Sequence, residues 1–260
     1  MKNFKREELE QELIQALAID GGEVSEARLS GFLRKYLGED RGAHVRAMIS
    51  EDLDFFRSLD PASTTYSQTQ ILSVRRGMAA VAAHRIFAEI LSQAKDVLYT
   101  LEVIAKYVQK DTNVEIHPAA KIGVPFAIDH GHSTVIGATT TIGRNVFIYH
   151  GVTLGASKRK SPSGRRHPRV GDDVFFGNGS QVLGPSIIES NVKLACSVHI
   201  RDCYVCKGAR IAMDVRLAGV IVPEGVRVLG HNQEQLQRYL VQQGQDAPRW
   251  QNLQPFIVED

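Results

Sequence analysis

This sequence has few cysteines, a small net charge and no long apolar run. An odd number of cysteines, three, in a chain without a recognisable secretion signal argues against a disulfide framework and predicts reduced thiols. The formal net charge of only +2 gives no reason to expect a nucleic acid or a membrane surface as partner. Because no run of about eighteen apolar residues occurs, we expect a soluble, cytoplasmic protein.

The apolar residues that are present follow two different periods. Up to about residue 110 their spacing is that of amphipathic helices, as in "ARLSGFLRKYL" and "ILSVRRGMAAVAAHRIFAEIL". From residue 116 an apolar residue recurs every six positions, with a slip of two residues after Ile128 and a polar interruption after Leu154. The two runs comprise Ile116, Ile122, Ile128, Ile136, Ile142, Ile148 and Leu154, and then Val170, Phe176, Val182, Ile188, Leu194, Ile200 and Cys206.

A six-residue apolar period is typical of a parallel β-helix, in which each coil stacks on the one before. The fourth residue after each apolar one is often small or β-branched, which suits a tight corner between short strands. We therefore predict an α+β protein with an α-helical domain over residues 1–111, a parallel β-helix over 112–230, and a C-terminal helix and tail over 231–260. Residues 155–169, "GASKRKSPSGRRHPR", lack the period and should form an extruded loop.

The two-residue slip contains the first candidate for chemistry, His130 in "IDHGHSTVIG". Histidine suits proton transfer near neutral pH, and a carboxylate that orients the ring makes it a stronger base. Asp129 is adjacent, so on a strand its side chain points to the opposite face, whereas coil stacking could bring Glu115 beside the turn. The alternative is a corner histidine bonded to backbone. His132 is expected to be a surface or interface residue.

The extruded loop carries six Lys or Arg and ends in Arg166 and His167. An arginine at this place can bind a carboxylate through two hydrogen bonds. The cluster Lys158, Arg159 and Lys160 could meet phosphates, although a solvated charged loop explains most of these residues equally well. The loop is therefore a candidate anion site with Arg166 as its most specific member.

Two other patterns are weak by themselves. Asp60 precedes a proline between helical segments, which predicts only a turn. Cys203 and Cys206 have the spacing of a zinc-ribbon pair, but a closed zinc site needs four ligands and no second pair exists. Cys206 also falls on the inward period, so packing in the core is the better interpretation.

Six stretches together resemble the serine acetyltransferase family: "DPASTTYS", "GMAAVAAHRI", "EIHPAAKIG", "IDHG", "VTLG" and "RRHP". These hexapeptide-repeat enzymes make O-acetylserine from serine and acetyl-CoA, and the resemblance covers roughly residues 58 to 200. It implies a left-handed parallel β-helix, a homotrimer or a dimer of trimers, and active sites between neighbouring subunits. It also implies acetyl-CoA as co-substrate and no metal.

The resemblance assigns roles residue by residue. His130 matches the general base and Glu115 its acidic partner, while Arg166 matches the arginine that binds the serine carboxylate. Asp60 and Asp129 match the carboxylates that hold the amino group, and His167 matches a histidine beside the acceptor. The residues expected to contact acetyl-CoA are Gly155, Ala156, Ser157, Gly177, Lys193 and Ala195.

Three departures from the family pattern stand out. Gly137-Ala138-Thr139 replaces the usual "GET", and "TLGASK" replaces "TLGGTG". The family's tail often ends in an isoleucine that docks into a partner sulfhydrylase, whereas this chain ends Val258-Glu259-Asp260. We therefore expect no sulfhydrylase docking through this tail.

Other readings of the same residues remain open. The acceptor could be another hydroxylated amino acid such as homoserine. A metal-dependent hydratase resembling the γ-type carbonic anhydrases could use His130, His132 and His150, but two of these are only two residues apart and the set lacks that family's ligand spacing. A non-catalytic hexapeptide scaffold would need none of the acidic, Arg and His residues assigned above.

Overall fold

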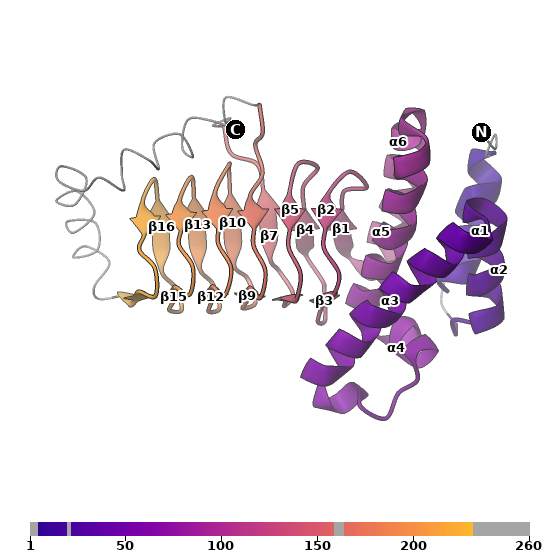
Figure 1. Ribbon diagram of the computed structural model, residues 1–260, viewed down its shortest axis with the longest axis horizontal. Helices are drawn as coiled ribbons and strands as arrows, with labels where there is room; N and C mark the ends of the chain where they lie inside the picture. Colours follow the sequence, from indigo (N-terminus) through magenta and orange to yellow (C-terminus); the bar gives the residue numbers. More distant parts are fainter. Residues whose placement is uncertain (1–4, 20–21, 159–163, 231–260) are drawn as a thin grey trace. The chain divides into compact units, whose positions relative to one another are not determined.

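The computed structural model describes residues 5–19, 22–158 and 164–230, and the contacts divide the chain into two units, 1–134 and 135–260. Helices fill the first unit up to residue 112, as predicted (Figure 1). They are α1 (Arg6–Ala16), α2 (Glu26–Leu37), α3 (Glu39–Leu59), α4 (Gln68–Val74), α5 (Arg76–Gln93) and α6 (Leu98–Thr112), with the short 3-10 turns η1 (Pro61–Ser63) and η2 (Lys95–Val97). None of the described helices is long and apolar enough to cross a membrane.

The apolar stretch over residues 71–91 is divided between two helices, α4 and α5. Ser67 begins α4 with a capping box, because its hydroxyl accepts from the backbone of Gln70 while the Gln70 side chain accepts from the backbone of Ser67. Arg75 then leaves the helical conformation, with φ −100° and ψ 88°, so that α5 starts in a new direction. The period in the sequence continues across this break, which is why the sequence did not reveal it.

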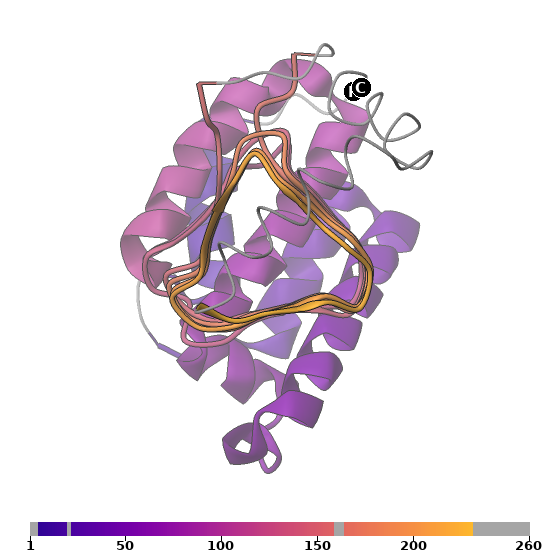
Figure 2. The same cartoon turned by 90° about the vertical axis from the view of Figure 1, so that its left-hand side faces the viewer.

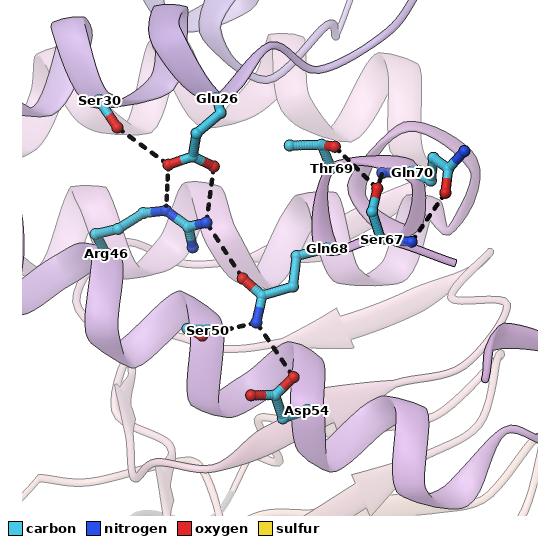
Figure 3. A network of polar contacts seen from close by, with 9 residues as sticks. All are labelled: Glu26, Ser30, Arg46, Ser50, Asp54, Ser67, Gln68, Thr69 and Gln70. Atoms are coloured by element: carbon cyan, nitrogen blue, oxygen red, sulfur yellow. Dashed lines mark hydrogen bonds and ion pairs between the residues drawn. The ribbon is translucent and has the colours of Figure 1, made fainter. Parts of the chain in front are cut away.

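A polar network joins α2, α3 and α4 within the first unit (Figure 3). Arg46 donates to both carboxylate oxygens of Glu26, at 2.9 and 2.8 Å, and to the side-chain oxygen of Gln68 at 3.2 Å. Gln68 in turn donates to Ser50 at 2.7 Å and to Asp54 at 3.2 Å. Exposed pairs of this kind contribute less than about 1 kcal/mol each, so the apolar residues between the helices provide most of their stability.

A buried ion pair connects α3, α5 and the first coil of the β-helix. Arg85 donates from Nε and Nη2 to the two carboxylate oxygens of Asp52, at 2.8 and 3.0 Å, and both side chains are almost fully buried. Arg85 also donates to the carbonyls of Ile122 and Gly123 at 2.5 and 2.7 Å. The backbone N–H of Phe126 donates to Asp52 at 2.8 Å. The charges are thus paired, and their hydrogen bonds fix the coil against the helices.

His84, one residue before Arg85, is a buried titratable group in the same helix. Its Nε2 lies 3.0 Å from the carbonyl oxygen of Ala120, and its Nδ1 is buried without a hydrogen-bond partner. Burial disfavours the charged ring, and together with the neighbouring Arg85 it lowers the pKa of His84 from 6.5 to about 3. His84 is therefore neutral in the folded protein, with its proton on Nε2.

We expect acid to destabilise the fold through His84. Between pH 6.5 and about 3 the unfolded chain binds a proton that the folded chain does not, so stability falls by up to about 1.4 kcal/mol per pH unit as the pH is lowered. In His84→Gln, which keeps a donor for Ala120, this component should be absent. Urea unfolding at several pH values between 7 and 5 measures it. An unchanged pH dependence in the variant would refute the assignment.

In the described residues after α6, eighteen short strands follow one another, three to each coil, and they pair in parallel as the hexapeptide period predicts. In the second unit the sheets run β4-β7-β10-β13-β16, β5-β8-β11-β14-β17 and β6-β9-β12-β15-β18, and the coils are triangular when seen along their stack (Figure 2). The strands are β1 (Val114–Ile116), β2 (Lys121–Ile122), β3 (Phe126–Ile128), β4 (Thr134–Ile136), β5 (Thr141–Ile142), β6 (Val146–Ile148), β7 (Thr153–Gly155), β8 (Arg169–Val170), β9 (Phe175–Phe176), β10 (Gln181–Leu183), β11 (Ile187–Ile188), β12 (Lys193–Leu194), β13 (His199–Arg201), β14 (Tyr204–Val205), β15 (Arg210–Ile211), β16 (Arg216–Ala218), β17 (Ile221–Val222) and β18 (Arg227–Val228).

The predicted inward positions are buried with two exceptions. Ile122 is only half-buried, and so is Cys206, which the six-residue period had placed in the core. The prediction for Cys206 was wrong because the coils shorten from 18 to 17 residues after Ile200. Val205 instead pairs with Ile188 and is fully buried. The three cysteines are free, and burial raises the pKa of the Cys203 thiol.

The corner residues and the extruded loop agree with the sequence. The small or β-branched corner positions are all buried, namely Ala120, Thr140, Val146, Val152, Ser180, Ser186, Val192 and Val198. In the sheet that contains β5 and β8, Ile142 pairs with Val170, 28 residues later, whereas uninterrupted coils repeat after 18. The described residues on either side of 159–163 leave one corner of the triangle (Figure 2). The predicted C-terminal helix lies outside the described residues.

Candidate active site

His130 lies on a tight turn with its ring exposed. The backbone of His130 is left-handed, with φ 59°, and its N–H donates to the Asp129 carboxylate at 2.9 Å. The other Asp129 oxygen lies 3.7 Å from His130 Nε2, and the His130 side chain is 58% exposed. The turn thus presents an imidazole to solvent beside a carboxylate, which is the arrangement that a general base requires.

Two glycines fix this turn against the start of α5. A Cβ on Gly131 would lie 2.8 Å from both the Cα of Gly77 and a methyl group of Val114. A Cβ on Gly77 would lie 2.4 Å from the carbonyl oxygen of Ile128. Because no side chain fits at either position without moving backbone, the two glycines set the position of His130.

Glu115, the expected partner of His130, has other partners in this chain. Gln109 donates to its carboxylate at 2.9 Å, and Lys106 lies at 3.4 Å. The carboxylate with a defined approach to the His130 ring is that of Asp129, although its neighbouring position in the sequence had suggested the opposite face. A role for Glu115 as the orienting acid stays a prediction.

Asp60 is an oriented and ionised carboxylate in the same unit. It accepts hydrogen bonds from Ser63 at 2.5 Å, from the backbone of Ala62 at 3.0 Å and from Arg75 at 2.9 Å. Partial burial would raise the pKa of Asp60, but these hydrogen bonds and the Arg75 charge outweigh it and hold the pKa below its usual value. The turn at Asp60 is thus more than a chain reversal, because it fixes an ionised carboxylate that is paired with Arg75.

The loop end leaves His167 largely buried in the second unit and Arg166 exposed. His167 is buried, and its Nδ1 lies 3.3 Å from the backbone N of Thr139 and 2.8 Å from the Thr139 hydroxyl. The backbone N–H points at Nδ1, which favours the tautomer with the proton on Nε2. A Cβ on Gly137 would lie 2.1 Å from the ring, so only glycine leaves room for it. Arg166 is exposed.

The residues expected at the thioester co-substrate lie on two parts of the second unit. Gly155 is the last residue of β7, and Ala156 is exposed. Ser157 donates a hydrogen bond to the Asp202 carboxylate at 3.0 Å, which holds the first residues of the loop against the neighbouring coil. Gly184 permits this contact, since a Cβ there would lie 2.0 Å from the same Asp202 oxygen. Arg159 and Lys160 of the predicted basic cluster lie outside the described residues.

Gly177, Lys193 and Ala195 lie on the sheet that contains β9 and β12. A Cβ on Gly177 would come within 2.6 Å of the Ala195 backbone, so the two coils stack closely at this point. Lys193 and Ala195 line a groove of about 410 Å³ on the outer face of the sheet.

Sequence reasoning missed the residues that hold the site in place. Thr139 follows Ala138 in the sequence, and nothing in the sequence indicates its contact with His167. Gly77 begins the motif "GMAAVAAHRI" and Gly131 ends "IDHG", but only the close approach of their backbones explains why glycine stands at each place. Among the described residues, no group of three His, Cys, Asp or Glu side chains is placed to hold a metal ion.

No protein-family model matches the chain, but individual proteins do. A serine acetyltransferase from Bacillus licheniformis is 36% identical over 160 residues, which are 61% of this chain and 71% of that protein. A serine acetyltransferase from Staphylococcus aureus strain Mu50 is 40% identical over 147 residues, 56% of this chain and 66% of that protein.

Solved structures agree with these relatives. The serine acetyltransferase of Neisseria gonorrhoeae in complex with serine matches 88% of this chain and 95% of its own, with a TM-score of 0.56 and 27% identity. The soybean serine acetyltransferase apoenzyme matches 86% of this chain and 95% of its own, with a TM-score of 0.55 and 26% identity. The likeness therefore extends over both the helices and the β-helix.

Proposed function

The chain belongs to the serine acetyltransferase family, and we propose that it transfers the acetyl group of acetyl-CoA to the hydroxyl group of L-serine, with His130 as general base. The observation that carries the catalytic assignment is the exposed imidazole of His130, held beside Asp129 on a turn that two glycines fix. Neither a solvated loop nor a structural scaffold requires an imidazole in that position.

The reaction needs one proton to move twice. His130 takes the proton of the serine hydroxyl as the oxygen attacks the thioester carbonyl carbon. The tetrahedral intermediate then collapses, the carbon–sulfur bond breaks, and the departing CoA sulfur takes the proton from His130. A neighbouring carboxylate stabilises the imidazolium formed between these steps, and Asp129 and Glu115 are the candidates for that role.

The remaining site residues suit a zwitterionic acceptor. Arg166 provides a planar pair of donors for the serine carboxylate. Asp60 and Asp129 provide negative charge for the ammonium group, and the lowered pKa of Asp60 keeps it ionised. His167 would donate from Nε2 to the bound acceptor. Clamping both charged groups leaves the hydroxyl directed at the base, which can contribute several kcal/mol to catalysis.

The donor and the assembly follow from the family. Gly155, Ala156, Ser157, Gly177, Lys193 and Ala195 are proposed to contact acetyl-CoA. We expect trimers, or pairs of trimers, with sites completed by neighbouring subunits, in the cytoplasm. The tail with Val258 to Asp260 lies outside the described residues, and the absence of sulfhydrylase docking stays a prediction.

We expect Thr139 to position His167. In Thr139→Val the ring loses the hydroxyl contact at 2.8 Å, and loss of one hydrogen bond should raise the KM for serine roughly three- to tenfold while kcat changes less. Thr139→Ser should restore the wild-type KM, because it keeps the hydroxyl group. Initial rates at varied serine concentration measure this. Equal KM values for the Thr139→Val variant and the wild-type protein would exclude the positioning role.

The function is tested by thiol release from acetyl-CoA with L-serine, L-homoserine and L-threonine as acceptors. The proposal predicts the highest kcat/KM with L-serine and background release without an acceptor. Preference for homoserine would assign another acceptor to the same mechanism and reject serine as substrate. Absence of release with every acceptor would favour the scaffold, and tightly bound stoichiometric zinc would favour the hydratase.

A further inference from the structure

Arg75 places a cation on one of the carboxylates that are proposed to hold the ammonium group of the acceptor. Its Nη2 donates to Asp60 at 2.9 Å, and its Nε donates to the hydroxyl group of Ser63 at 3.1 Å. Ser63 is completely buried and donates in turn to the same Asp60 oxygen. The side chains of Arg75 and Asp60 are 25% and 15% exposed, so water screens this ion pair only in part.

The Asp60 carboxylate keeps room for one more partner. A carboxylate offers about four acceptor positions, two on each oxygen. Arg75 and Ser63 occupy those of Oδ2, and the backbone N–H of Ala62 occupies one of those of Oδ1. No further donor from the described residues contacts Asp60, so one acceptor position on Oδ1 remains for a ligand. The anion that offers this position already has a cation on its other oxygen.

The same arginine stands beside the second carboxylate proposed for the ammonium group. Arg75 immediately precedes α5, and Gly77 follows two residues later. A Cβ on Gly77 would lie 2.4 Å from the carbonyl oxygen of Ile128, the residue before Asp129. The start of α5 therefore supports the turn that carries Asp129 and at the same time provides the cation for Asp60.

Arg75 halves the net negative charge around the proposed ammonium site. Asp60 and Asp129 together bring two negative charges for one ammonium group, and the positive charge of Arg75 leaves one. Asp60 counts as ionised, because its pKa lies below the usual value. Burial raises the pKa of Asp60, but the hydrogen bonds from Ser63 and Ala62 and the Arg75 charge lower it by more.

An additional negative charge acts differently on a zwitterion and on a cation. It attracts the ammonium group of L-serine but repels the carboxylate on the same carbon atom, so the two effects largely cancel. An amino alcohol without the carboxylate, such as ethanolamine, experiences only the attraction. At about 6 Å and an effective dielectric constant of about 40, one unit charge changes the affinity for such a cation roughly tenfold.

We propose that Arg75 determines specificity for a zwitterionic acceptor, because its charge compensates that of Asp60 and keeps the ammonium site from favouring hydroxylated amines that carry no carboxylate. This inference rests on the proposed function. Arginine suits the role because its planar fork reaches Ser63 and Asp60 with two nitrogen atoms, which fixes the cation on Oδ2 and leaves Oδ1 to the acceptor.

The test measures competition between ethanolamine and L-serine. In Arg75→Met, which keeps the aliphatic stem without the charge, the Ki of ethanolamine should fall roughly tenfold. The KM for L-serine should change by less than about threefold, because the effects on its two charged groups oppose each other. Arg76→Met is the matched control, since Arg76 has a side chain 26% exposed and forms an ion pair with Asp111. Both constants should stay within about twofold in that control.

Two more variants separate the charge of Arg75 from its hydrogen bonds. Arg75→Gln also removes the charge but keeps a donor for Asp60, and it should reproduce the fall in Ki even if Arg75→Met does not fold. Ser63→Ala removes the hydroxyl group that Arg75 and Asp60 share but leaves both charges. In Ser63→Ala the Ki of ethanolamine should therefore fall by less than about twofold.

Several outcomes would overturn the inference. An unchanged Ki of ethanolamine in both uncharged Arg75 variants would exclude the charge effect. A rise in that Ki together with a higher KM for L-serine would mean that Arg75 only positions Asp60. A higher KM for L-serine with an unchanged Ki would assign Arg75 to the serine carboxylate. An equal fall in Ki in Arg76→Met would attribute the effect to the general charge of the helix start.

Calorimetry with L-serine and ethanolamine in the absence of acetyl-CoA separates this inference from the proposed function. Tighter ethanolamine binding in the uncharged Arg75 variants, in a protein that acetylates no hydroxy amino acid, would support the role of Arg75 and reject the transferase. Normal serine acetylation with ethanolamine binding unchanged in the variants would support the transferase and reject the role of Arg75. Absence of binding of both ligands to every variant would also reject it.

Discussion

Substitution of His130 by alanine is expected to lower kcat for acetyl transfer to serine by a factor of about 10²–10⁴, the usual contribution of a positioned general base. The serine hydroxyl is a poor nucleophile until its proton is removed, and the exposed His130 ring is the group proposed to remove it. The KM for either substrate should change much less, because the groups proposed to bind serine and acetyl-CoA remain. Initial rates of thiol release, with both substrates varied, measure this.

His132 supplies the matched control for that experiment. It is a histidine two residues away and is also exposed, and the mechanism assigns it no proton. His132→Ala should therefore retain kcat within about twofold of the wild-type value, small beside the loss expected of a general base. Similar losses in the two variants would mean that disturbance of the turn, and not loss of the base, lowers the rate.

Replacement of Arg85 by alanine is expected to reduce the free energy of unfolding by about 3–5 kcal/mol. The variant would leave the Asp52 carboxylate buried without its cation, and the carbonyls of Ile122 and Gly123 would lose their donor. Because these contacts join α3 and α5 to the first coil, the loss should appear as a lower denaturant midpoint for that unit. Urea unfolding monitored by circular dichroism measures it.

An exposed pair between the same two helices is the control. Arg41 of α3 donates to Glu89 of α5 at 2.9 Å, and the Arg41 side chain is 54% exposed. Arg41→Ala should cost less than about 1 kcal/mol. A double replacement of Asp52 and Arg85 by apolar residues of similar size should recover part of the loss, since no buried charge then remains unpaired. If Arg85→Ala lowered the free energy of unfolding no more than Arg41→Ala does, the buried ion pair would not stabilise this unit as its geometry indicates.

The fold was predictable wherever burial alone determines the residue type. Inward positions such as Phe176 and Val182 are buried by their own coil and by the coils above and below, so they must be apolar, and the period is visible. The same period failed at Cys206 because one turn became shorter by a residue. A shorter turn changes no residue type, so only the paired strands reveal it.

The candidate site was predictable in part. The motif around His130 is local, and so is the proximity of Asp129, but the contact between Gly131 and Gly77 joins residues more than fifty positions apart. The contact of Thr139 with His167 likewise depends on how one coil stacks on another. The only sign of such a distant contact in the sequence is a single glycine or threonine. Because these residue types occur for many other reasons, they do not predict the contact.

The most direct test of the proposed activity is the mass of L-serine after incubation with acetyl-CoA and the purified full chain. The mechanism predicts that wild-type protein and His132→Ala convert serine to its O-acetyl ester, and that His130→Ala under the same conditions yields little or none. Failure of the wild-type protein to acetylate serine, or equal product from His130→Ala, would contradict it.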